Sequence, residues 1–235
     1  MAGRKPGRRP RLTMRVVLYA EGAGEIAGAG GMEWHTDSIL DEDGLGAAHE
    51  LVRRCLSREE GGPVPSAAVR FQGPLRMGRG RIPKGSDLLD RENLRRLLTW
   101  LQPGLQPDLA VVLVDEDGQS SRKKMLEGLV AAIPVNKVIA VAIREFEAWL
   151  VADEAVASEA MGKTFERTRD PETMAPGEAK AQWASWVSGG DECAARLTVA
   201  RTVDLDGLAS RCRAFETFRG ELRRAVSSAS SSTSG

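Results

Sequence analysis

Two short apolar runs, far apart in the chain, each end in an acidic residue. Residues 15–20 lead into Glu21 and Gly22, and residues 109–114 lead into Asp115. Short runs that are rich in β-branched residues and bounded by glycine predict buried strands of a parallel or mixed sheet. In open α/β sheets the carboxyl ends of neighbouring strands meet at one crevice, where ligands bind. The sequence therefore predicts that acidic side chains converge at one edge of a sheet.

The second run continues into a further carboxylate. Asp115 and Asp117 are two positions apart, so in an extended backbone both side chains point to one side and Glu116 points to the other. Grouped carboxylates repel one another unless a hard cation neutralises them, and Mg²⁺ prefers oxygen ligands. We therefore expect a divalent-metal site formed by Glu21, Asp115 and Asp117.

Predicted strands and helices alternate up to Arg144, and the remainder of the chain has a helical pattern. Helices are expected at 44–55, 88–101 and 120–132, further strands at 67–71 and 137–143, and glycine-rich loops at 21–31 and 76–84. This alternation predicts an α/β fold with a central, mostly parallel sheet flanked by helices, followed by a helical C-terminal extension.

The composition predicts where the folded part begins and ends. We expect a basic disordered tail at 1–14, the α/β domain at 15–152, the helical extension at 153–226 and a serine-rich disordered tail at 227–235. The basic tail is either a solvated end or an arm that contacts phosphate, and Met14 is an alternative start to Met1.

Composition also excludes several classes of protein. The 33 basic and 33 acidic residues balance, so the overall charge gives no signal for nucleic acid. Three cysteines without a CxxC pair predict a reducing cytoplasm and argue against a disulfide framework or a zinc site. No apolar stretch approaches the roughly 20 residues of a membrane span, and no signal-peptide core follows the N-terminus. We therefore expect a cytoplasmic protein.

The first glycine-rich loop allows a rival interpretation. Residues 22–27 match the G-x-G-x-x-A form of a dinucleotide-binding turn after a strand. Glu21 and Glu25 would, however, repel the pyrophosphate that such a turn must bind. A ribose-binding acid should also follow a second strand, but the acidic residues at 41–43 follow no strand-like run. The metal site is therefore the favoured interpretation.

Several motifs together carry a family resemblance. The Glu-Gly after the first strand and the Asp-x-Asp after a later one resemble the Toprim domain of topoisomerases, primases and overcoming-lysogenization-defect nucleases. Glu21-Gly22-x-x-Glu25 is similar to the E-G-x-[ST]-E form of the nuclease branch, with Gly24 in place of the hydroxyl residue. The segments 144–150 and 204–222 resemble a bacterial Toprim-like family of unknown function, which is often encoded beside ATPases in defence loci. The resemblance spans residues 15 to about 225.

The resemblance implies roles for the carboxylates. Glu21, Asp115 and Asp117 would hold one or two Mg²⁺ or Mn²⁺ ions, Glu25 would be a second metal ligand or general base, and Glu147 would close the site. Glu145 is expected to form a surface ion pair or to support the site from outside. Phe146, Trp149 and Leu150 are spaced as a core-facing helix stripe.

Basic residues near the predicted site are candidates for contact with substrate phosphate. They are Arg79, Arg81 and Lys84 in the second loop and Arg122 and Lys123 after the acidic strand, and the loop could equally be a solvated surface. His49 is expected to be structural and His35 to lie in a loop. Tyr19, the only tyrosine, lies inside the first predicted strand, which argues against topoisomerase chemistry.

The function expected from these features is a Mg²⁺-dependent phosphodiesterase or nuclease that acts on nucleic acid. Phage defence beside an ATPase partner is the setting that the resemblance implies. The alternative is a non-catalytic subunit that keeps the Toprim shape and binds an ATPase.

Overall fold

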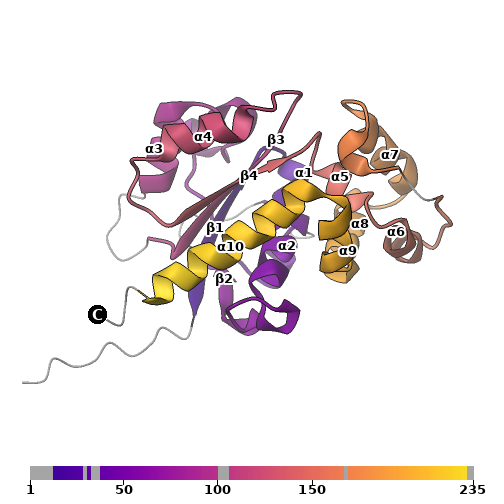
Figure 1. Ribbon diagram of the computed structural model, residues 1–235, viewed down its shortest axis with the longest axis horizontal. Coiled ribbons are helices and arrows are strands. Elements are labelled where there is room, and N and C mark those ends of the chain that lie inside the picture. The colour runs from indigo at the N-terminus through magenta and orange to yellow at the C-terminus, as the bar shows by residue number, and fades with distance from the viewer. Residues whose placement is uncertain (1–12, 29–30, 33–37, 100–105, 167–168, 232–235) are drawn as a thin grey trace, which may run out of the picture.

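The computed structural model describes residues 13–28, 31–32, 38–99, 106–166 and 169–231. Its centre is a sheet of four strands in the order β2-β1-β3-β4, in which every neighbouring pair is parallel. The strands are β1 (Met14–Ala20), β2 (Val69–Phe71), β3 (Leu109–Asp115) and β4 (Lys137–Ala142) (Figure 1). The predicted α/β class with a parallel sheet is confirmed.

Helices cover both faces of the sheet, so the central strands are buried on both sides. On one face Val16 and Leu18 of β1 pack in a core shared with α2 (Ala47–Leu56) and α10 (Arg213–Ser231). On the other face Val17 and Tyr19 share a core with α3 (Arg91–Thr99) and α4 (Arg122–Val130). Figure 1 shows α10 lying across one face of the sheet and α3 with α4 beyond the other.

The chain after β4 is helical, as predicted. An aromatic cluster joins this extension to the sheet domain: Trp149 packs edge-on to Phe215 with ring centroids 5.2 Å apart and stacks on Phe218 at 5.6 Å. Phe146, Trp149 and Leu150 are fully buried in the same core, which confirms their predicted core positions. Trp149 lies on α5 (Glu147–Leu150), which follows β4 within the predicted sheet domain, and the extension comprises α6 (Glu154–Met161), α7 (Glu178–Val187), α8 (Glu192–Thr202), α9 (Leu205–Arg211) and α10.

Several predicted boundaries differ from the structure. A short helix, α1 (Ala23–Ile26), lies inside the first loop, where none was expected. The serine-rich tail was predicted to begin at residue 227, but α10 continues to Ser231, and the Ser227 hydroxyl donates to the Arg223 carbonyl at 2.9 Å. Because the hydroxyl donates to a carbonyl in the preceding helical turn, the serine is accommodated within the helix. Residues 1–12, which are most of the predicted basic tail, and residues 232–235, the last four of the predicted serine-rich tail, lie outside the described residues.

Short 3₁₀ segments connect the main elements, at 42–44, 58–60, 66–68, 78–80, 85–88 and 171–173. Within the part of the chain that the structure describes, no helix is long and apolar enough to cross a membrane.

Candidate active site

The strand order places the candidate site. The chain passes from β1 to β2 on one side and returns to β3 on the other, so the order reverses between β1 and β3. Ligands of open α/β sheets bind outside the carboxyl ends of strands at such a reversal. Glu21 directly follows β1 and its backbone NH donates to the Leu113 carbonyl at 3.0 Å, while Asp115 ends β3. Both acids therefore lie at the point where the fold favours a ligand.

Backbone amides hold the two carboxylates in place. Glu21 Oε2 accepts a hydrogen bond from the Asp115 NH at 2.9 Å. Asp115 Oδ1 accepts from the Phe146 NH at 2.8 Å, in the turn that follows β4. One oxygen of each carboxylate thus accepts a hydrogen bond from a backbone NH, at the end of β3 for Glu21 and in the turn after β4 for Asp115. The tips of β1, β3 and β4 are linked through the acids that were predicted to converge.

Glu25, on α1, is buried at the same edge. Its side chain folds back so that Oε1 accepts from the Gly22 NH at 3.1 Å, and the residue is only 5% exposed. Oε2 is buried and has no hydrogen-bond partner within the described residues. Because the Glu25 carboxylate fills the glycine turn, a dinucleotide pyrophosphate could not use the amides there, which argues against the dinucleotide interpretation.

Glu147 begins α5 and faces an arginine that sequence reasoning missed. Glu147 Oε1 accepts from Arg196 Nη2 at 2.6 Å, and both side chains are buried. Arg196 comes from α8, bonds also to Glu192, and lies over the Trp183 ring at 5.9 Å. No motif surrounds Arg196 in the sequence, so only the packing of the helical extension against the sheet could reveal it.

Arg196 also packs against the first loop of the site. A Cβ atom at Gly24 would lie 3.6 Å from the Arg196 guanidinium carbon, which is an ordinary van der Waals distance. The helical extension thus completes the first loop of the site with a cation.

Burial and neighbouring carboxylates raise the pKa values of Asp115 and Glu25. The pKa of Asp115 rises from its ordinary 3.8 to about 7, first because the group is buried and then because Glu147 and Glu21 are negative. The pKa of Glu25 lies well above its usual range, again through burial and then through the charges of Asp115 and Glu147; Arg196 opposes this rise. Such repulsion is what a bound cation would remove.

Asp117 does not lie where the strand alternation predicted. The strand ends at Asp115, and Asp117 adopts a positive φ of 47° in the turn that follows, so the two side chains do not share an extended backbone. Its side chain is 53% exposed, and Oδ2 accepts from Arg122 Nη1 at 2.7 Å. The prediction of alternating side chains was wrong here because the chain turns before reaching Asp117.

Arg122 is an internal cation of the site. It is 3% exposed, donates to the Asp115 carbonyl at 2.5 Å and lies 3.8 Å from Glu21 Oε2. Its guanidinium therefore lies close to all three residues that were predicted to bind metal, Glu21, Asp115 and Asp117. It is bound inside the protein, whereas the sequence suggested a contact with substrate phosphate.

The other predicted cations divide into two groups. Lys123 forms an ion pair with Glu221 of α10 at 2.6 Å, and Arg81 forms a forked pair with Asp87, with Nη2 2.7 Å from Oδ1. Arg79 and Lys84 are exposed. The basic loop is therefore the remaining source of accessible positive charge among the predicted phosphate contacts.

Three further residues form other contacts. Glu145 Oε2 accepts from the Lys180 NH in the first turn of α7 at 2.9 Å, and its predicted supporting role stays a prediction. Buried His49 accepts at Nδ1 from the Gly46 NH at 3.2 Å, as expected of a structural histidine, and His35 lies outside the described residues. The buried Tyr19 hydroxyl donates to the Leu97 carbonyl at 3.1 Å, so it is badly placed as a nucleophile.

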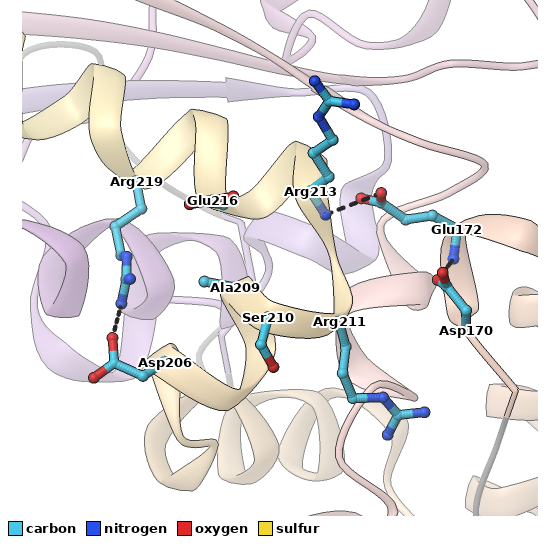
Figure 2. Close-up of a pocket in the computed structure, with 9 residues that line it drawn as sticks. All are labelled: Asp170, Glu172, Asp206, Ala209, Ser210, Arg211, Arg213, Glu216 and Arg219. Carbon is cyan, nitrogen blue, oxygen red and sulfur yellow. Dashed lines mark hydrogen bonds and ion pairs between the residues drawn. The ribbon is translucent and has the colours of Figure 1, made fainter.

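Another pocket, of about 450 Å³, lies between α9 and α10, away from the carboxylate edge. Its charges serve the fold: Glu172 accepts from the Arg213 and Ala214 NH groups that begin α10, and Asp206 pairs with Arg219 at 2.6 Å (Figure 2). Figure 2 shows the Arg213 side chain pointing away from Glu172. This pocket contains none of the predicted site residues.

The structure thus brings Glu21, Glu25, Asp115 and Glu147 to one edge and directs Asp117 toward Arg122. Among the described residues, no three His, Cys, Asp or Glu side chains are arranged so that they could hold a metal ion as they stand. The chemistry of the set nevertheless fits a hard cation, because all donors are carboxylates and buried Glu25 Oε2 lacks a partner. Comparison with family models, with curated proteins and with solved structures found no match for this chain.

Proposed function

We propose that this protein is a Mg²⁺-dependent phosphodiesterase that cleaves nucleic acid. The observation that supports this most is the unpartnered, buried Oε2 of Glu25 beside the mutually repelling Asp115 and Glu147. A buried polar atom without a partner is costly, and a bound ion is one group that can supply the missing partner. For a group of carboxylate oxygens that partner is a hard divalent cation.

The chain's own residues would share the work as follows. Glu21, Asp115 and Glu25 would hold the cation, with Asp115 fixed by the Phe146 amide. Bound Mg²⁺ would polarise a phosphodiester and lower the pKa of a bound water. In the metal-free protein burial and neighbouring carboxylates raise the pKa of Asp115 to about 7, and a bound cation would keep this ligand ionised.

The two buried arginines would position the acids. Arg122 orients Asp117 and lies near Glu21, and Arg196 holds Glu147. Glu147 and Asp117 would then act as supporting groups, with Glu147 closing the site from the side of the helical extension. The setting proposed for this activity is phage defence in the cytoplasm beside an ATPase partner.

One observation favours a second candidate, a non-catalytic subunit of an ATPase complex. Internal arginines already satisfy Asp117 and Glu147, as they would in a protein that keeps the fold without binding a metal. In that case Arg122 and Arg196 would take the place of the cation. The two candidates differ in whether the wild-type chain cleaves any substrate.

A cleavage assay on supercoiled, linear and single-stranded DNA and on RNA, with Mg²⁺ or Mn²⁺, tests the proposal. Asp115→Asn should abolish cleavage, whereas Asp43→Asn, an exposed acid on the 42–44 segment, should cleave like the wild type. Asp117→Asn should retain more activity than Asp115→Asn, because Arg122 already engages its carboxylate. A wild-type protein that is inert on all substrates, alone and with an ATPase encoded beside it, would support the subunit candidate.

A further inference from the structure

A pocket of about 260 Å³ opens next to the carboxylates. Ala20, the last residue of β1, and Ile26 of α1 line one part of it, so it lies one residue from Glu21 and one from Glu25. Ile82 and Pro83 add an apolar wall from the basic loop. The pocket therefore shares its wall with the elements that carry the candidate site.

Three cations line the same pocket. They are Arg76, Arg81 and Lys84, all from the loop at 76–84. Arg81 pairs with the carboxylate of Asp87, which lies just beyond the loop. The loop therefore carries a net positive charge next to a strongly acidic edge, although the whole chain is neutral.

Hydrogen bonds fix this loop against the sheet. The Gly85 NH donates to the Glu21 carbonyl at 3.1 Å, which ties the loop to the carboxylate edge directly. Arg76 Nη1 donates to the Gly80 carbonyl at 2.6 Å, and the Lys84 NH donates to Asp87 Oδ2 at 3.2 Å. The backbone that carries these cations is thus held at a set place relative to Glu21.

We propose that this pocket binds one nucleotide of the nucleic acid strand and holds its phosphate close to the carboxylate edge. Arg76, Arg81 and Lys84 would contact the phosphate, and Ile82 would pack against the sugar or base. This inference rests on the proposed function and adds where the strand lies. A ligand with an anionic part and an apolar face matches a pocket with cations on one side and an apolar wall on the other.

The size and charge of the pocket support a single nucleotide. Its volume of about 260 Å³ is slightly below the roughly 300–1,000 Å³ of small-molecule sites, so it can take at most one nucleotide. Phosphate neutralisation by arginine and lysine supplies most of sequence-independent binding to nucleic acid. The acidic edge alone would repel a strand, so a local cationic grip is needed for the phosphate to approach it.

The test is the binding of a fluorescein-labelled single-stranded 12-mer DNA, followed by anisotropy in EDTA at several salt concentrations. Lys84→Ala should weaken binding about threefold to tenfold and make the salt dependence shallower by about one phosphate contact. Lys84→Glu should weaken it further. The matched control is Lys124→Ala, an exposed lysine on α4, which should bind like the wild type.

The outcomes separate this inference from the proposed function, because EDTA removes any metal-dependent step. Suppose that the wild type cleaves nothing but binds the 12-mer, and that the Lys84 variants bind it more weakly. This result would support the pocket and refute the phosphodiesterase. Cleavage with unchanged binding in both Lys84 variants would refute the pocket and keep the phosphodiesterase. Wild-type protein that binds no 12-mer at low salt would also refute the pocket. If dAMP displaced the labelled 12-mer as effectively as unlabelled 12-mer does, the pocket would bind free nucleotides, and the proposal that it binds a nucleic acid strand would be refuted.

Discussion

Neutralising Asp115 should stabilise the metal-free protein, and more so as the pH rises. Asp115→Asn keeps the shape of the side chain and an oxygen that can accept from the Phe146 NH. It removes the negative charge that Glu147 and Glu21 repel. A substitution at the centre of a candidate active site is therefore expected to make the fold more stable while abolishing its activity.

The magnitude follows from the pKa of Asp115, which rises from 3.8 to about 7 in the folded protein. The folded state then binds more protons than the unfolded state between these two values, so the free energy of unfolding falls as pH rises through this window. Below pH 3.8 the cost is absent, and above about 7 it is complete. At about 1.4 kcal/mol per pH unit, the cost approaches 4 kcal/mol above pH 7. Because Glu25 shares the repulsion, we expect a gain of about 1–4 kcal/mol at pH 8.

The assay is urea unfolding in EDTA at pH 5, 6, 7 and 8, with Asp43→Asn as the control. The quantity to follow is the difference between variant and wild type, because buried His49 adds an opposite pH dependence below pH 6.5 that both proteins share. This difference should grow with pH up to about 7 and then level off. A variant that is no more stable than the wild type at pH 8 would refute the reasoning.

Two further predictions concern other buried charges. Arg196→Met leaves Glu147 buried without its cation and should lower the free energy of unfolding by about 3–5 kcal/mol, measured by urea unfolding. Arg196→Lys should recover part of this loss. Equal stability of all three proteins would show that the pair does not hold the helical extension. His49 has its pKa lowered from 6.5 to about 3 by burial, so acidification below pH 6.5 should reduce stability by up to about 1.4 kcal/mol per pH unit from this residue. Thermal melts between pH 4 and 7 should show a smaller loss in His49→Gln, and an unchanged loss would contradict this assignment.

Local pattern was enough to predict the sheet. The β-branched runs that became β1, β3 and β4 are continuous and apolar because both faces of the strands are covered. The acids at their ends followed from the geometry of parallel strands. Glu21 and Asp115 were therefore predicted from strand pattern alone, whereas Glu25 was proposed only through the resemblance of the first loop to a family motif.

The rest of the site depends on contacts that no local pattern contains. Arg196 reaches Glu147 from 49 positions away, and the fold alone makes them neighbours. Arg122 opens α4, where cations oppose the helix dipole, so its sequence position hinted at another use without showing which. Asp117 was misplaced because the left-handed turn after β3 ends the alternation one residue earlier than the pattern suggested.

The central claim is that the carboxylate edge binds a divalent cation, and calorimetric titration of Mn²⁺ into the metal-free protein tests it most directly. Wild-type protein should bind Mn²⁺ and become more stable by about 2.7 kcal/mol at a hundredfold excess over the dissociation constant. Asp115→Asn should lose the binding, and Asp43→Asn should keep it. Absence of any heat with wild-type protein up to millimolar Mn²⁺, or equal binding by Asp115→Asn, would contradict the claim.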